Sequence, residues 1–188
     1  EKQHVGLADD IRLEMTEYST TGLVEATRYF WEQANALSRE IPRGADGAPV
    51  FPSFEELAAT AGDGYKTLTV DHSFSVFAGS TVPVKKLGWA DMFTSLGVSG
   101  LTLPLTGEAA VNPNIPTVCI PFTMCRELAY RMCIAVEQDA GMAAFLACRV
   151  HEDPAFRYSG YFMAYVYCYD ALTRVGTSPA NAEAAALQ

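Results

Sequence analysis

The pentapeptide Arg-Glu-Leu-Ala-Tyr at positions 126–130 lies inside an apolar helical stretch and constrains this chain more than any other feature. Positions 126 and 130 are four residues apart, so an α-helix places both side chains on one face. Pro121 suits the first turn of such a helix, because the first turn does not require its missing amide donor. We expect this helix to end near Ala135 and to be followed by helices over residues 137–150 and 154–175.

The pentapeptide keeps the glutamate of the zinc-protease pattern H-E-x-x-H but neither of its histidines. In that pattern two imidazoles, one turn apart, bind a single Zn²⁺, and the adjacent glutamate acts as the general base. Arg126 cannot bind a metal because its guanidinium stays protonated. Tyr130 is a poor replacement for a neutral imidazole. The pattern therefore indicates a metallopeptidase scaffold whose metal site has been dismantled.

The N-terminal half is expected to contain helices joined by a loop. A helix capped by Thr20 or Thr21 is predicted to continue to about Arg39, because apolar residues recur along it at helical spacing. Residues 42–52 are rich in proline and glycine, which is typical of a loop.

A capping box is formed in the sequence by Ser53 and Glu56, and it predicts the start of a second helix. This helix is expected to extend past Tyr65, although Gly62 and Gly64 weaken the helical pattern. Residues 66–79 are compatible with either a continuation or a break.

Residues 81–118 have a different character and predict short strands. Their apolar residues alternate over short distances, and a helical turn is expected at residues 90–96. Pro104 interrupts the apolar run 101–105, which favours an edge strand, because an edge position needs fewer backbone donors. The predicted fold is α+β and mainly α, with a small β-sheet beside the motif helix.

Composition sets further limits on what this chain binds. The 188 residues are 49% hydrophobic, which suits a single domain, here residues 18–176, with a flexible arm at 1–17 and a frayed tail at 177–188. The net charge of −9 argues against binding nucleic acid or anionic lipid, since both demand basic patches. No apolar run of about eighteen residues occurs, so nothing in this sequence is expected to span a membrane.

The cysteines and histidines give no metal-binding pattern. Five cysteines lie in apolar stretches without any C-x-x-C pair, so we interpret them as small buried hydrophobic residues. An extracellular location would permit disulfides, and the odd number leaves at least one thiol free. His151 is interpreted as a surface residue, no functional role is assigned to His72, and His4 belongs to the N-terminal arm.

Residues 85–175 closely resemble domain-of-unknown-function family 3810, a family of membrane-anchored bacterial proteins. Its members carry a gluzincin-like motif of the form HELAH, followed by an E-x-x-A-N segment on the next helix. Here these become RELAY at 126–130 and Glu-Gln-Asp-Ala-Gly at 137–141. Flanking phrases that match the family lie at residues 106–112, 121–123 and 156–161, whereas residues 18–80 follow it only in helical pattern.

The resemblance implies a zincin-like fold and a set of site positions. Arg126 and Tyr130 would occupy the two histidine positions, Glu127 the general-base position and Glu137 the third-ligand position. Gly141 stands where the family has asparagine. The resemblance also implies transmembrane helices on the N-terminal side, outside this sequence, and thus a domain at the extracellular face of the bacterial cytoplasmic membrane.

Without a metal, two carboxylates at this site would repel each other in a cleft of reduced dielectric. The planar guanidinium of Arg126 can bind a carboxylate and replace part of the charge of the ion. We therefore predict an ion pair between Arg126 and Glu137, with the hydroxyl of Tyr130 bonded nearby.

Three further residues are weaker site candidates. Tyr158 belongs to a family phrase, and a tyrosine near a zinc cleft can stabilise an oxyanion, although packing within an aromatic helix also explains it. Glu108 and Asn112 precede the motif helix and could bind a peptide backbone, although a role in a turn explains them equally.

The function expected from these observations is that of a catalytically inactive, metallopeptidase-like extracellular domain that binds or scaffolds through its remnant cleft. A peptide or a membrane protein would be the partner, and no cofactor is expected. The first alternative is a zinc-dependent metallopeptidase, as the intact family motif suggests, and this alternative alone requires zinc. The second alternative is a purely structural ectodomain.

Overall fold

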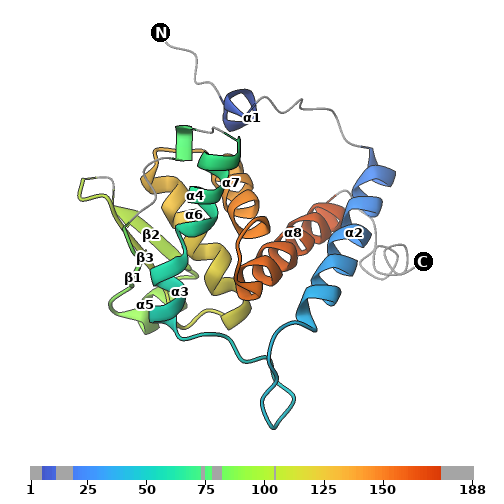
Figure 1. The fold of residues 1–188 in the computed structure, drawn as a ribbon, viewed down its shortest axis with the longest axis horizontal. Coiled ribbons are helices and arrows are strands. Elements are labelled where there is room, and N and C mark those ends of the chain that lie inside the picture. The colour runs from blue at the N-terminus through green and yellow to red at the C-terminus, as the bar shows by residue number, and fades with distance from the viewer. Residues whose placement is uncertain (1–5, 12–18, 73–74, 78–81, 104, 175–188) are drawn as a thin grey trace.

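The computed structural model describes residues 6–11, 19–72, 75–77, 82–103 and 105–174. Over these residues the fold is α+β and mainly helical, with a small three-stranded sheet, as the sequence predicts (Figure 1). The sheet lies at one side of the molecule and α2 at the other, with α6, α7 and α8 between them. The helices are α1 (Leu7–Asp10), α2 (Thr20–Ser38), α3 (Phe54–Thr60), α4 (Asp63–His72), α5 (Ala90–Ser95), α6 (Ile120–Arg131), α7 (Glu137–Arg149) and α8 (Pro154–Arg174), with short 3₁₀ turns η1 (Ser75–Phe77) and η2 (Thr117–Cys119).

The N-cap of the first long helix, α2, lies one residue before the first of the two predicted cap residues. Ser19, and neither Thr20 nor Thr21, is the N-cap, because its hydroxyl accepts a hydrogen bond from the amide of Gly22 at 3.0 Å. The apolar face of α2 packs against α8, where Leu23 meets the fully buried Leu172. The predicted arm contains α1, and the predicted tail at residues 177–188 lies outside the described residues.

The capping box is confirmed, and the helix after it is broken in two. The hydroxyl of Ser53 accepts from the amide of Glu56 at 3.3 Å, and the Glu56 carboxylate accepts from the amide of Ser53 at 2.8 Å. The chain bends between α3 and α4, before Asp63. At Gly64 a Cβ atom would lie only 2.2 Å from the carbonyl oxygen of Ala147, so the glycine allows α4 to touch α7.

The sheet has the order β1-β3-β2, formed by β1 (Lys85–Lys86), β2 (Gly100–Leu103) and β3 (Glu108–Val111). β1 pairs with β3 in parallel, and β2 pairs with β3 in antiparallel orientation. Thus β2 is an edge strand, as the sequence predicts for this region, while Pro104 itself lies outside the described residues. The predicted helical turn at residues 90–96 is α5, which connects β1 to β2.

Helix α6, which carries the pentapeptide, is the centre of the fold. Nine of its twelve residues are buried, and it packs against β2, β3, α7 and α8. It ends at Arg131, four residues before the predicted end, because Cys133 adopts a left-handed conformation with φ of 68°. The reversal returns Ile134 to the core. Helices α7 and α8 have the predicted bounds to within a residue.

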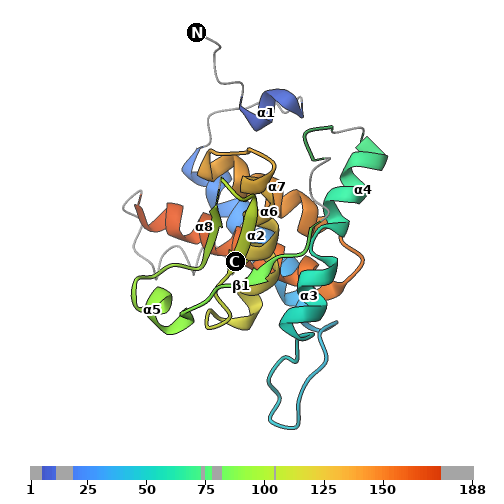
Figure 2. The ribbon, with the colours of Figure 1, turned by 90° about the vertical axis from the view of Figure 1, so that its left-hand side faces the viewer.

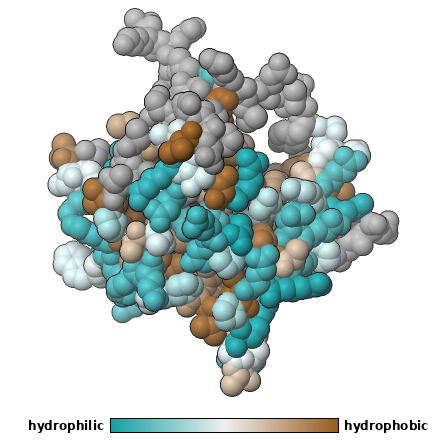
Figure 3. Space-filling model, viewed as in Figure 1, coloured by the Kyte–Doolittle hydropathy of each residue, from teal (hydrophilic) through white to brown (hydrophobic). Residues whose placement is uncertain are grey.

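The molecular surface mixes polar and apolar side chains. Figure 3 shows that, on the face seen in Figure 1, apolar side chains appear at several separate places among polar ones. Among the described residues, none of the helices is both long enough and apolar enough to cross a membrane.

Candidate functional site

The side chains of α6 and α7 converge as the ion-pair prediction requires. Arg126 Nη1 lies 3.7 Å from Glu137 Oε1, and the Tyr130 hydroxyl donates to Glu137 Oε2 at 3.2 Å. Glu137 is the first residue of α7, so its position depends on the short reversal that follows α6. The Arg126 side chain is 14% exposed, whereas that of Glu137 is 76% exposed. The contact therefore lies at the rim of the site, where water weakens it.

The buried partner of Arg126 is Glu127, whose side chain is only 2% exposed. Arg126 Nη2 lies 3.5 Å from Glu127 Oε1 and donates to the Ser99 hydroxyl at 2.8 Å. The Thr102 hydroxyl on β2 lies 2.8 Å from Glu127 Oε2 and 3.0 Å from the Glu127 carbonyl oxygen, so it can donate to either acceptor. Glu127 thus points into the interface between α6 and the sheet.

A glycine on β2 makes the space for this carboxylate. A Cβ atom at Gly100 would lie 2.5 Å from Glu127 Oε1 and 2.7 Å from Glu127 Cδ, well inside van der Waals contact. A side chain at residue 100 would therefore force the strand or the Glu127 carboxylate to shift. The sheet and the motif helix meet through this contact.

At both Glu127 and Arg126, burial and neighbouring groups shift the pKa in opposite directions. Burial raises the pKa of Glu127 above its ordinary value, and the hydrogen bond from Thr102 and the charge of Arg126 only partly offset this effect. Burial by itself lowers the pKa of Arg126, but Tyr167, Glu127 and Tyr130 outweigh it and raise that pKa. Burial, followed by the charge of Glu137, raises the pKa of Tyr130 to about 12. The arginine is thus a permanent positive charge beside two acidic groups.

Two residues of the site were not singled out by the sequence. Ser99 accepts from the Arg126 guanidinium, and Tyr167 of α8 affects its pKa. No motif or pattern in the sequence around Ser99 distinguishes it from other serines. Tyr167 lies in the aromatic α8, where a stripe of aromatic residues indicates packing.

The site offers few metal ligands. The described residues contain no group of three or more histidine, cysteine, aspartate or glutamate side chains that could hold a metal ion. Residues 126 and 130 are an arginine and a tyrosine, neither of which is an ordinary zinc ligand, whereas the carboxylate of the neighbouring Glu137 could serve as one.

The weaker candidate residues Glu108 and Asn112 stabilise the sheet and its loops. Glu108 forms an ion pair with Lys85, which joins β3 to β1. Asn112 is fully buried, and its amide group donates to the Thr94 hydroxyl at 2.9 Å and to the Val98 carbonyl at 3.0 Å. These bonds hold the α5 loop, so the side chain of Asn112 is already engaged.

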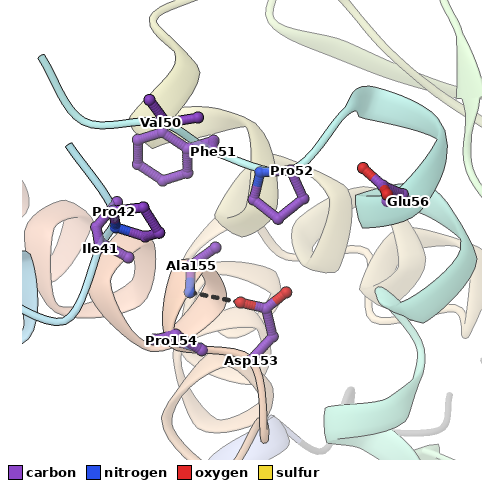
Figure 4. Close-up of a pocket in the computed structure, with 9 residues that line it drawn as sticks. All are labelled: Ile41, Pro42, Val50, Phe51, Pro52, Glu56, Asp153, Pro154 and Ala155. Atoms are coloured by element: carbon purple, nitrogen blue, oxygen red, sulfur yellow. Dashed lines mark hydrogen bonds between the residues drawn. The ribbon is translucent and has the colours of Figure 1, made fainter. Parts of the chain in front are cut away.

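Tyr158 lies in an aromatic cluster with Phe51 and Phe162, and its ring stacks on Phe51 at a centroid separation of 6.1 Å. A hollow of about 390 Å³ opens beside Phe51, between the loop after α2 and the start of α8 (Figure 4). The carboxylate of Asp153, at the border of this hollow, already accepts a hydrogen bond from the Ala155 amide at 2.8 Å. A second hollow, of about 530 Å³, lies along α2. The motif residues line neither of these hollows.

His151 is buried, and the prediction of a surface position was wrong. Its ring stacks on Phe156 at 4.0 Å and is only 4% exposed. The Asp153 amide donates to Nδ1 at 3.0 Å, so Nε2 carries the proton and donates to the Thr60 carbonyl oxygen at 3.0 Å. Both ring nitrogens are therefore satisfied. His72 has no described side chain, and His4 lies outside the described residues.

These features define a mainly helical α+β domain in which a partly exposed arginine of the central helix contacts one buried and one exposed carboxylate. Over residues 2–186 the chain matches the family described as "Protein of unknown function (DUF3810)", and it belongs to that family. No curated protein matches the chain significantly, and no solved structure does so either.

Proposed function

We propose that this chain is a catalytically inactive, metallopeptidase-like domain that binds an extended peptide segment beside a remnant metal site. The observation that carries the proposal is the position of the Arg126 guanidinium, within 3.7 Å of carboxylate oxygens of both Glu127 and Glu137. In the zincin-like arrangement that the family resemblance implies, these are the positions around a metal ion. The guanidinium supplies positive charge there without Lewis acidity.

The state of Glu127 supports catalytic inactivity. A general base must reach a water molecule or substrate, within hydrogen-bonding distance of the proton that it removes. Glu127 is 2% exposed and is engaged by Arg126 and Thr102, so its carboxylate is not free to do this. The zinc-dependent peptidase remains the alternative function, and it would need ligands in addition to Glu137.

Among the described residues no strand pairs with the outer edge of β2, and this free edge supports peptide binding. The Asn112 amide donates to the Ser99 carbonyl at 2.9 Å, which marks residues 99 and 112 as a hydrogen-bonded pair of the antiparallel ladder. Such pairs alternate along a strand. Leu101 and Leu103 therefore direct their backbone groups towards β3, while Gly100 and Thr102 direct theirs towards the free edge. An added strand at this edge would lie next to the Arg126 site.

The partner we propose is an extended segment of a peptide or of a membrane protein, at the outer face of the bacterial cytoplasmic membrane. The family resemblance supports this location, with transmembrane segments on the N-terminal side of this sequence. The exposed side chains of Leu101 and Leu103 support an apolar contact with such a segment, because they lie beside the unpaired edge.

Peptide titration with paired variants tests this proposal. A ¹⁵N-labelled chain is titrated with a pool of capped, apolar hexapeptides, and binding is expected to shift the amide resonances of Gly100 and Thr102. Thr102→Pro removes the free-edge amide donor together with the hydroxyl, whereas Thr102→Val removes only the hydroxyl. We expect the proline variant to lose binding and the valine variant to keep most of it.

Two outcomes would contradict peptide binding at this edge. Equal binding by both variants would place the peptide elsewhere. A complete lack of shifts with the pool, in a folded protein, would favour the purely structural ectodomain. Cleavage of the hexapeptides that depends on added zinc, and that is lost in Glu127→Gln, would favour the peptidase instead.

A further inference from the structure

Two buried thiols face each other beneath the motif site. Cys125 on α6 and Cys148 on α7 are fully buried, and their sulfur atoms lie 3.7 Å apart, with the Cys148 thiol donating to Cys125 Sγ. Both cysteines are free thiols in the structure. A disulfide has a bond length of about 2.05 Å, so the two sulfur atoms need to approach by roughly 1.7 Å to form one.

The packing around the pair limits how far the two helices can separate. On the outer side of α7, a Cβ atom at Gly160 would lie 2.6 Å from Cys148 Cβ, so α8 presses closely on Cys148. On the outer side of α6, the Tyr65 hydroxyl donates to the Cys125 carbonyl at 2.9 Å. The Cys125 thiol lies 3.6 Å from the carbonyl oxygen of Ala61. The two thiols are thus held together from both sides.

We propose that Cys125 and Cys148 are a disulfide-forming pair that cross-links the motif helix to α7. The bond would hold α7, and with it Glu137, in a fixed position relative to Arg126, which lies next to Cys125 in the sequence. This inference does not depend on peptide binding at β2, because it rests only on the geometry of the two thiols. The remaining cysteines, Cys119, Cys133 and Cys168, then stay free.

The chemistry of the cross-link is a thiol–disulfide exchange with a small disulfide such as oxidised glutathione. The two cysteines lose two protons and two electrons as the S–S bond forms, and the oxidant accepts both electrons and leaves as two thiols. In the folded protein both thiols are inaccessible, and burial raises the pKa of the Cys148 thiol well above its ordinary value. The reactive thiolate is therefore disfavoured, and the bond forms during folding and not afterwards.

The test uses a Cys119→Ala, Cys133→Ala and Cys168→Ala variant, which keeps only the buried pair. The variant is unfolded, then refolded with oxidised and reduced glutathione, and its free thiols are counted by alkylation under denaturing conditions. We expect both thiols to disappear together in a monomer, and peptide mapping to find residues 125 and 148 linked. The oxidised form should melt roughly 6–12 °C above the reduced form.

The same variant, oxidised without unfolding, should keep both thiols for much longer, because the thiols are buried. The single-thiol control adds Cys148→Ala and should yield only a glutathione adduct. Two free thiols after oxidative refolding, glutathione adducts on the paired variant, or covalent dimers would overturn the proposal. If the triple alanine variant does not fold, peptide mapping of the refolded natural sequence decides between a 125–148 link and any other.

Discussion

The two faces of the small sheet differ in how their residues are used. On the inner face, Thr102 meets the buried Glu127, and Ala109 and Val111 are fully or almost fully buried against α6. On the outer face, Leu101 and Leu103 are 38% and 44% exposed (Figure 2 views the molecule from the sheet side). The inner face has to match the charge and shape of the motif helix, whereas no such requirement acts on the outer face. Substitutions on the two faces should therefore change the free energy of unfolding by very different amounts.

The largest effect is expected from removing the positive charge beside the buried Glu127. Arg126→Ala leaves the buried Glu127 without its charged partner, and we expect a loss of about 3 kcal/mol in the free energy of unfolding. Urea denaturation measures this loss. The control is Lys66→Ala, which breaks an exposed ion pair with Asp63 and should cost less than about 1 kcal/mol. Equal losses in the two variants would mean that the Arg126 pair contributes no more than a surface contact.

A smaller loss is expected from Gly100→Ala on the inner face. The added methyl group meets the Glu127 carboxylate, so the strand or the glutamate must shift, at a cost of about 2 kcal/mol by urea denaturation. Gly88→Ala is the matched control, because a Cβ atom at Gly88 has no neighbour within 4 Å among the described residues. If Gly100→Ala were as stable as the control, β2 would not lie over Glu127 as described.

Glu127→Gln should change how stability depends on pH. The pKa of Glu127 is raised in the folded protein above its ordinary value of 4.5, so the unfolded chain ionises first as the pH rises. The contribution of Glu127 to stability then decreases as the pH rises from 4.5 to its folded pKa, and stays level above it. Glu127→Gln lacks this decrease, whereas Glu25→Gln on the exposed face of α2 should keep it. Parallel pH profiles for both variants would contradict the raised pKa.

The smallest effect is expected on the outer face. Leu103→Ser removes an exposed apolar side chain, and we expect the free energy of unfolding to change by less than about 0.5 kcal/mol. Peptide binding, measured by the same titration as above, should nevertheless weaken. A large loss of stability would show that the outer face is covered in solution, for example by a second copy of the chain.

Local signals in the sequence predicted most of the fold. The capping box at Ser53, the early proline of α6 and the apolar spacing of α7 and α8 each act over a few residues, and each was confirmed. The end of α6 was predicted too late, because the left-handed residue there is Cys133 and not the glycine that usually marks such a reversal.

Parts of the site depend on long-range packing that the sequence does not encode locally. The ion pair between Arg126 and Glu137 was predicted from the family resemblance and from charge, and it forms. The burial of Glu127 depends on Gly100, which is 27 residues away in the sequence and carries no signal by itself. His151 looked like a surface residue because acidic residues follow it, yet it contacts Phe156 and Thr60 in the core.

The most direct test of the proposed remnant metal site is to introduce the two histidines of the family motif. In Arg126→His with Tyr130→His, two imidazoles would lie one turn apart beside Glu137, which completes a three-ligand set. Metal analysis and calorimetry of the folded double variant should find one zinc ion, which is lost when Glu137→Gln is added, and the natural protein should bind none at this site. A folded double variant that binds no zinc, or a natural protein that holds zinc between residues 126 and 137, would contradict a site in which arginine has replaced the metal.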